Sequence, residues 1–136
     1  MFYSEISGLA ARIIESWKPT PNSEFTKFFD ANPTGLTVFD LDTTVKVLEF
    51  YSLVRDHNEL KEQYFGIKSD LRLTEKLRRA RLGDIHKDLK ALKERIRQQS
   101  STILQSEYRR YRLKELERAI KLIGKAGDNL LIRVTE

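Results

Sequence analysis

The feature that most constrains this fold is a helical pattern that runs almost without a break from residue 69 to residue 123. One straight helix over about 50 residues would be roughly 75 Å long, which is out of scale for a compact domain of 136 residues. We therefore expect a kink or a tight reversal, either at Gly83 or within residues 98–102. Apolar side chains recur along this stretch at spacings of three, four and seven residues, so they share one face of a helix. This seam comprises Ile85, Leu89, Leu92, Ile96 and Ile103.

The first half of the chain predicts further helices that pack against this seam. Helical spacing indicates a first helix over residues 4–17 and a short second helix around Phe25, Phe28 and Phe29. Residues 36–41, with the sequence LTVFDL, alternate weakly and suit a short strand or an extended lead-in.

A third helix, predicted at residues 44–65, has an unusually wide apolar surface. Asp42 or Thr43 suits its N-cap, and Gly66 suits its C-cap. The width favours burial on two sides and a central place in a bundle. Its main stripe is Val45, Leu48, Tyr51 and Val54, with Val47, Phe50 and Leu53 beside it.

The end of the chain differs from the rest in composition. Residues 124–129 are glycine-rich and predict a linker, and residues 130–134, with the sequence LLIRV, predict a strand. This strand either pairs with residues 36–39 or opens a second domain of a longer parent protein, and we favour the second. The fold expected is mainly α, a multi-helix bundle with long antiparallel helices. Residues 1–124 form the helical domain, and residues 125–136 form the linker and first strand of a small β-domain that is mostly absent.

Composition excludes several classes of protein. The chain has no cysteine and only two histidines, so disulfides, a cysteine nucleophile and zinc sites are not expected. No run approaches the roughly 20 apolar residues of a spanning helix, and the N-terminus lacks the features of a secretory signal. Phosphate-binding, dinucleotide-binding, serine-hydrolase and zinc-protease motifs are missing. We expect a protein with no cofactor, no metal and no membrane contact.

Charge is distributed unevenly along the chain. Residues 1–66 hold six Lys/Arg and ten Asp/Glu, a formal charge of −4, whereas residues 67–136 hold nineteen and ten, a charge of +9. The basic half faces either nucleic acid or an acidic neighbour, which includes the chain's own first half. No helix-turn-helix or RNA-binding fingerprint is present, so any nucleic-acid binding is expected to be weak and nonspecific. The candidate basic contact patch is Arg78, Arg79, Arg81 and Arg109.

One short pattern in the basic half resembles a catalytic motif. Arg81 and His86 match the R-x4-H signature of HEPN ribonucleases, which are small helical bundles that dimerise. The residue after the arginine is usually polar in that family, and here it is Leu82. The ordinary alternative is that both are surface residues beside a glycine bend. A HEPN-type ribonuclease or a basic helical nucleic-acid-binding bundle is therefore the alternative function.

The stretch from Tyr108 to Arg118, YRRYRLKELER, carries a basic face and an apolar face that continues to Ile123. Together with the helical domain before it, this block resembles the GINS complex of DNA replication, in the subunit type that places its helical domain first. The linker and the LLIRV strand resemble the start of that family's β-domain. The matching residues are Tyr108, Arg110, Arg112, Leu113, Lys114, Leu116 and Glu117.

This resemblance implies a scaffold rather than an enzyme. GINS subunits pair through helical domains into a hetero- or homo-tetramer, which bridges the MCM helicase and its RecJ-like partner. It implies a chromosome-associated protein of the cytoplasm if the source is archaeal, and a nuclear protein if it is eukaryotic. The residues expected at subunit interfaces are Leu48, Tyr51, Val54, Leu89, Leu92, Ile96, Leu113, Leu116 and Ile120.

Overall fold

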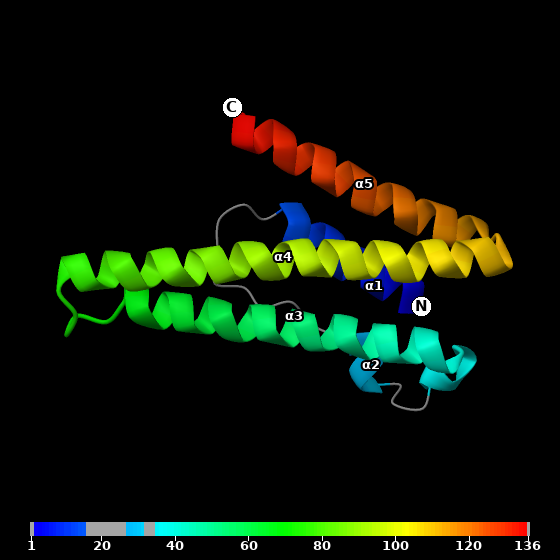
Figure 1. The fold of residues 1–136 in the computed structure, drawn as a ribbon, viewed down its shortest axis with the longest axis horizontal. Helices are drawn as coiled ribbons and strands as arrows, with labels where there is room; N and C mark the ends of the chain where they lie inside the picture. The colour runs from blue at the N-terminus through cyan, green and yellow to red at the C-terminus, as the bar shows by residue number, and fades with distance from the viewer. Residues whose placement is uncertain (1, 16–26, 32–34, 136) are drawn as a thin grey trace.

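The computed structural model describes residues 2–15, 27–31 and 35–135, and over these ranges every regular element is a helix (Figure 1). It forms a bundle with long antiparallel helices, which confirms the predicted helical architecture. The predicted aromatic helix around residues 25–29 lies partly outside the described ranges. The elements are α1 (Phe2–Glu15), α2 (Lys27–Ala31), the 3-10 turn η1 (Gly35–Val38), α3 (Leu41–Lys68), α4 (Glu75–Tyr111) and α5 (Lys114–Thr135).

The longest helix, α4, organises the others. It runs antiparallel to α3 on one side and to α5 on the other, and α1 packs against both α4 and α5 (Figure 1). Helix α1 is amphipathic, and its inward residues Ile6, Leu9 and Ile13 are almost completely buried. A single apolar core therefore joins all four long helices, and α3 lies at the edge of the bundle, against α4.

Helix α3 is longer at both ends than the sequence predicted. Its N-cap is Asp40, whose carboxylate accepts a 2.8 Å hydrogen bond from the amide of Thr43. At the other end the helix continues past Gly66 to Lys68, and the C-cap is Ser69. The predicted caps at Asp42 or Thr43 and at Gly66 are therefore wrong. The short strand or extended lead-in predicted at residues 36–41 is also wrong, because η1, the Asp40 cap and the start of α3 occupy these positions.

Helix α4 runs without a break through both predicted weak points. Gly83 costs about 1 kcal/mol relative to alanine in a helix, which continuous packing against α3 can offset. Polar side chains in the second weak stretch are hydrogen-bonded, since Ser100 Oγ donates to the Arg97 carbonyl of the same helix at 3.0 Å and Gln99 Nε2 donates to the Lys46 carbonyl of α3 at 3.0 Å. The reversal comes later, at Arg112, which adopts a left-handed conformation with φ 53° and ψ 34°.

The predicted linker at residues 124–129 and the strand at residues 130–134 are wrong, because α5 continues through both. Residues spaced by three and four along α5 are buried against the rest of the bundle, namely Leu116, Ala119, Ile123 and Ala126. This spacing belongs to a helix rather than a strand. The two glycines, Gly124 and Gly127, cost about 1 kcal/mol each, which this packing outweighs. Glycine content alone was therefore a poor signal for a linker.

Candidate interaction surface

The predicted subunit-interface residues separate into two groups. Seven of them pack inside the chain itself. Tyr51, Val54, Leu89, Ile96 and Leu116 are buried, while Leu92 and Ile120 are half-buried against the same core. Only Leu48 and Leu113 are exposed, each by nearly half. Helical spacing identifies apolar faces correctly, but it does not say whether the covering helix belongs to the same chain.

Tyr51 shows how completely one of these residues is used within the chain. Its ring stacks on Phe29 of α2 with the centroids 4.1 Å apart, and its hydroxyl donates a 2.6 Å hydrogen bond to Glu5 Oε1 of α1. Burial, followed by this bond to a carboxylate, raises the pKa of the Tyr51 phenol well above its usual value. Tyr51 therefore ties α1, α2 and α3 together and is not available to another subunit.

The outward face of α3 carries an exposed apolar stripe that the bundle does not cover. Three of its residues, Leu41, Val45 and Leu48, are spaced by four and three, which places them in one line along the helix. The fourth, Val38, lies in η1 before the Asp40 cap. In order along the chain, the exposed fractions are 69% for Val38, 80% for Leu41, 48% for Val45 and 45% for Leu48. We call this set the α3 stripe. It faces away from the buried residues of the same helix, such as Val47 and Phe50.

The sequence indicated the apolar residues of this stripe but not that they would be exposed. The wide apolar surface of α3 predicted burial on two sides. In the bundle only one of these sides is buried, and Val45 and Leu48 belong to the other. A central position within one chain was therefore the wrong inference, since α3 is an edge helix whose second apolar side faces outward.

Acidic residues border the α3 stripe on the side nearest α4. Asp42, Glu49 and Asp56 are all exposed and follow one another at heptad spacing. Glu49 Oε2 accepts a 3.1 Å hydrogen bond from Gln99 Nε2 of α4. Glu49 and Asp56 also line a surface hollow of about 240 Å³ between α3 and α4. An apolar line and an acidic line thus run side by side along α3.

The residues that carry the family resemblance lie at the α4–α5 reversal. Arg112 ends α4 as its C-cap, and its guanidinium lies 5.7 Å from the centre of the Tyr108 ring. Lys114 is the first residue of α5, and Glu117 forms a 3.4 Å ion pair with Lys121 one turn later. The motif residues thus flank the reversal between the two helices, and all of them are exposed except the half-buried Tyr108 and the buried Leu116.

Arg110 connects this reversal to the start of α3. Its Nη2 forms a 2.6 Å ion pair with Asp40, the N-cap of α3. Hydrogen bonds from the Thr43 amide and then from Arg110 lower the pKa of Asp40 to about 2. The α3 stripe therefore begins beside a fixed junction of α3 and α4.

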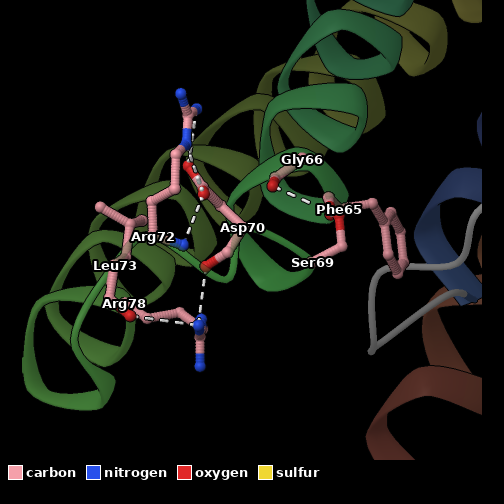
Figure 2. A network of polar contacts seen from close by, with 7 residues as sticks. All are labelled: Phe65, Gly66, Ser69, Asp70, Arg72, Leu73 and Arg78. Carbon is pink, nitrogen blue, oxygen red and sulfur yellow. Dashed lines mark hydrogen bonds and ion pairs between the residues drawn. The ribbon is translucent and has the colours of Figure 1, made fainter.

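The predicted basic patch does not form a single surface. Figure 2 shows Arg78 closing the loop between α3 and α4, where it donates to the Asp70 carbonyl at 2.7 Å and the Leu73 carbonyl at 3.2 Å. Arg79 pairs with Glu75 at 2.7 Å, and Arg81 is exposed. Arg109 lies near the opposite end of α4, about 40 Å away along the helix. A patch read from these four arginines would have to span the length of α4.

The seam between α3 and α4 contains a layer of basic side chains that the sequence pattern did not indicate. His57 and Lys61 continue the buried stripe of α3, and Lys93 is half-buried opposite them on α4. Burial, reinforced by Lys61 and Lys93, lowers the pKa of His57 to about 4. Burial and Lys90 lower the pKa of Lys93 to about 8. His57 Nδ1 has no hydrogen-bond partner among the described residues.

Within one chain, the R-x4-H residues do not converge. Arg81 and His86 lie on the unbroken helix α4, where five residues correspond to about 140° of rotation. In the described ranges, no three His, Cys, Asp or Glu side chains lie together so as to hold a metal ion. Every helix in the described part of the chain is too short or too polar to cross a membrane. No family model, curated protein or solved structure matches the chain.

Proposed function

We propose that this chain is a non-enzymatic scaffold subunit that assembles with other proteins through the α3 stripe. The observation that carries the proposal is the line of exposed apolar side chains on an edge helix. The solvent-facing side of a bundle helix is normally polar, and a contiguous apolar patch on it marks an interaction surface. Complete burial of one valine or leucine side chain contributes about 1.5–3 kcal/mol. Covering the stripe would therefore contribute substantially to an interface.

The GINS resemblance supplies the specific form of this proposal. In that form the chain pairs with other GINS subunits, and the assembly bridges the MCM helicase and its RecJ-like partner. Support comes from the helical bundle and from the motif residues between Tyr108 and Glu117. The LLIRV segment no longer supports it, since these residues lie in α5 rather than in a strand. The replication assignment thus rests on the motif, whereas the scaffold assignment rests on the α3 stripe.

The test is recovery of partners from source cells by tagged protein, before and after nuclease treatment. We compare Leu41→Asp with the matched control Leu71→Asp, because both leucines are highly exposed and both variants should fold. The expected result is a second small helical subunit together with the replicative helicase, insensitive to nuclease, lost with Leu41→Asp and kept with Leu71→Asp.

Two results would contradict the proposal. Retention of every partner by Leu41→Asp would remove the α3 stripe from the interface. Recovery of nucleic acid alone, lost after nuclease or high salt, would favour the nucleic-acid-binding alternative, and cleavage of RNA that depends on His86 would favour the HEPN alternative. A stripe-dependent complex without replication proteins would keep the scaffold and remove the GINS assignment.

A further inference from the structure

We infer that the partner of the α3 stripe is a helix of a different protein chain, with an apolar seam at heptad spacing and a row of Lys or Arg along one flank. The inference rests on the proposed scaffold function and specifies the chemistry of its partner.

The apolar part of this surface has the geometry of a helix–helix seam. The spacing of four and three from Leu41 through Val45 to Leu48 is that of alternating seam positions in a heptad repeat. A second helix that lies along this line would place its own apolar residues between those of α3. A hollow of about 240 Å³ beside Leu53, between α3 and α4, offers room at the edge of that contact.

The charged part of the surface selects among helices. Asp42, Glu49 and Asp56 occupy one flank of the seam at heptad spacing, and all three are exposed. Charges on the flanks of a helix–helix seam set partner choice through interhelical ion pairs. A partner helix with Lys or Arg on the facing flank would be attracted by these carboxylates, whereas an acidic flank would be repelled. On the α4 side, Arg95 lines the same hollow as Glu49 and Asp56.

The same acidic flank argues against a second copy of this chain. In an antiparallel two-fold pair of α3 helices, each flank faces its own counterpart, so the three carboxylates would face the same three carboxylates. In a parallel two-fold pair they would face the opposite flank, which carries Arg55. That arginine already lies 3.9 Å from Asp30 and 5.7 Å from the centre of the Phe29 ring.

The other exposed apolar residues do not offer a copy of this chain a comparable surface in the part whose side chains the structure describes. Apart from the α3 stripe, the large apolar residues exposed within residues 2–15, 29–31, 35, 36 and 38–128 do not form a line of three on any helix. They are Leu71, Leu77, Tyr111, Leu113 and Leu122. The geometry therefore favours a different chain over self-association.

The test uses the whole chain and two synthetic helical peptides of three heptads with identical leucine seams. One peptide carries lysine along one flank, and the other carries glutamate at the same positions. We expect the lysine peptide to bind at least about tenfold more tightly at low salt, since several flanking ion pairs replace like-charge contacts. The difference should shrink as salt rises. Fluorescence anisotropy of labelled peptides measures both affinities.

Charge reversal on α3 makes this test specific. Glu49→Lys combined with Asp56→Lys spares the first turn of α3 and should remove or invert the tenfold preference. Glu117→Lys combined with Asp128→Lys is the matched control, because it changes net charge equally on exposed residues of α5, away from α3. The control should keep the preference for the lysine peptide. The chain alone should sediment as a monomer of 16.0 kDa.

The contradicting outcomes separate the inference from the proposed function. Equal binding of both peptides, abolished by Leu41→Asp, would overturn the basic partner and leave the scaffold function standing. A stable homodimer, also abolished by Leu41→Asp, would do the same. Failure of both peptides to bind would overturn the inference, and the recovery of partners from cells would then decide the scaffold function independently.

Discussion

The hydroxyl of Tyr51 lies 2.6 Å from Glu5 Oε1, and the same oxygen accepts a 3.0 Å hydrogen bond from the amide of Phe29. One carboxylate thus connects α1, α2 and α3. Tyr51 is 1% exposed. The helix that carries the exposed α3 stripe is therefore fixed in place by a residue one turn after Leu48.

Replacing Tyr51 should affect stability rather than assembly. We expect Tyr51→Phe to lower the free energy of unfolding by about 1–3 kcal/mol, because the buried end of Glu5 loses a hydrogen bond. Recovery of partner proteins should be unchanged. Urea denaturation gives the stability, and Tyr64→Phe, whose ring is half-buried, is the control expected to change little. Loss of partners from a folded Tyr51→Phe protein would place this residue at the interface after all.

Arg112 should tolerate glycine better than alanine. A left-handed conformation costs an L-residue roughly 1–2 kcal/mol, and glycine avoids this cost. Both substitutions remove the contact with the Tyr108 ring. The difference between their free energies of unfolding therefore reports only the cost of the left-handed backbone conformation. We expect Arg112→Gly to be about 1 kcal/mol more stable than Arg112→Ala in urea denaturation. Equal stabilities would mean that position 112 does not hold a left-handed conformation.

His57 should make the protein less stable as the solution becomes acidic. Its pKa falls from 6.5 to about 4 on folding, so below pH 6.5 the unfolded chain binds a proton that the folded chain does not. The free energy of unfolding therefore has its full value above pH 6.5. It decreases by up to about 3 kcal/mol as the pH falls toward 4.

The measurement is the urea midpoint as a function of pH. His57→Leu should flatten the decline between pH 6.5 and 5, where most carboxylates remain ionised. His86→Gln is the control, since His86 is the other of the two histidines in the chain, and it should leave the decline in place. An unchanged profile in His57→Leu would show that His57 is not buried in its neutral form.

Two leucines of the motif should behave in opposite ways. Leu116 is completely buried, so Leu116→Asp should unfold the chain by placing a carboxylate in the core. Ile120→Asp should be less severe, because Ile120 is half-buried. Leu113 is 46% exposed, and Leu113→Asp should fold normally. Circular dichroism and thermal melting distinguish these outcomes, and a folded Leu116→Asp protein would contradict the position of α5.

The pattern of apolar residues predicted most helices correctly, but it did not predict what covers each apolar face. Spacing identified the inward faces of α3 and α4 down to residues such as Val54 and Ile96, because a helix places every third or fourth side chain on one face. It failed at residues 124–134, where glycines and β-branched residues suggested a linker and a strand. Packing of Leu116 and Ile123 against the bundle overrides these local preferences.

The candidate surface could be predicted only in part. The wide apolar surface of α3 was visible, but whether this chain or another covers it depends on where α1, α2 and α4 lie. The Asp40–Arg110 ion pair and the left-handed Arg112 had no signal that a single sequence provides. Arg81 and His86 are close in sequence, but α4 turns their side chains in different directions. The basic patch is divided because the length of α4 separates Arg109 from the other three arginines.

The most direct test of the scaffold account is the reactivity of a cysteine placed in the α3 stripe. The chain has no cysteine of its own, so Val45→Cys introduces a single thiol at the centre of the stripe. Its rate of alkylation is measured in the isolated chain and in the assembly recovered from source cells, with Lys76→Cys on α4 as the exposed control. The account predicts that Val45→Cys reacts readily in the isolated chain and is protected in the assembly, whereas Lys76→Cys reacts in both. Equal alkylation of Val45→Cys in the two states would contradict it.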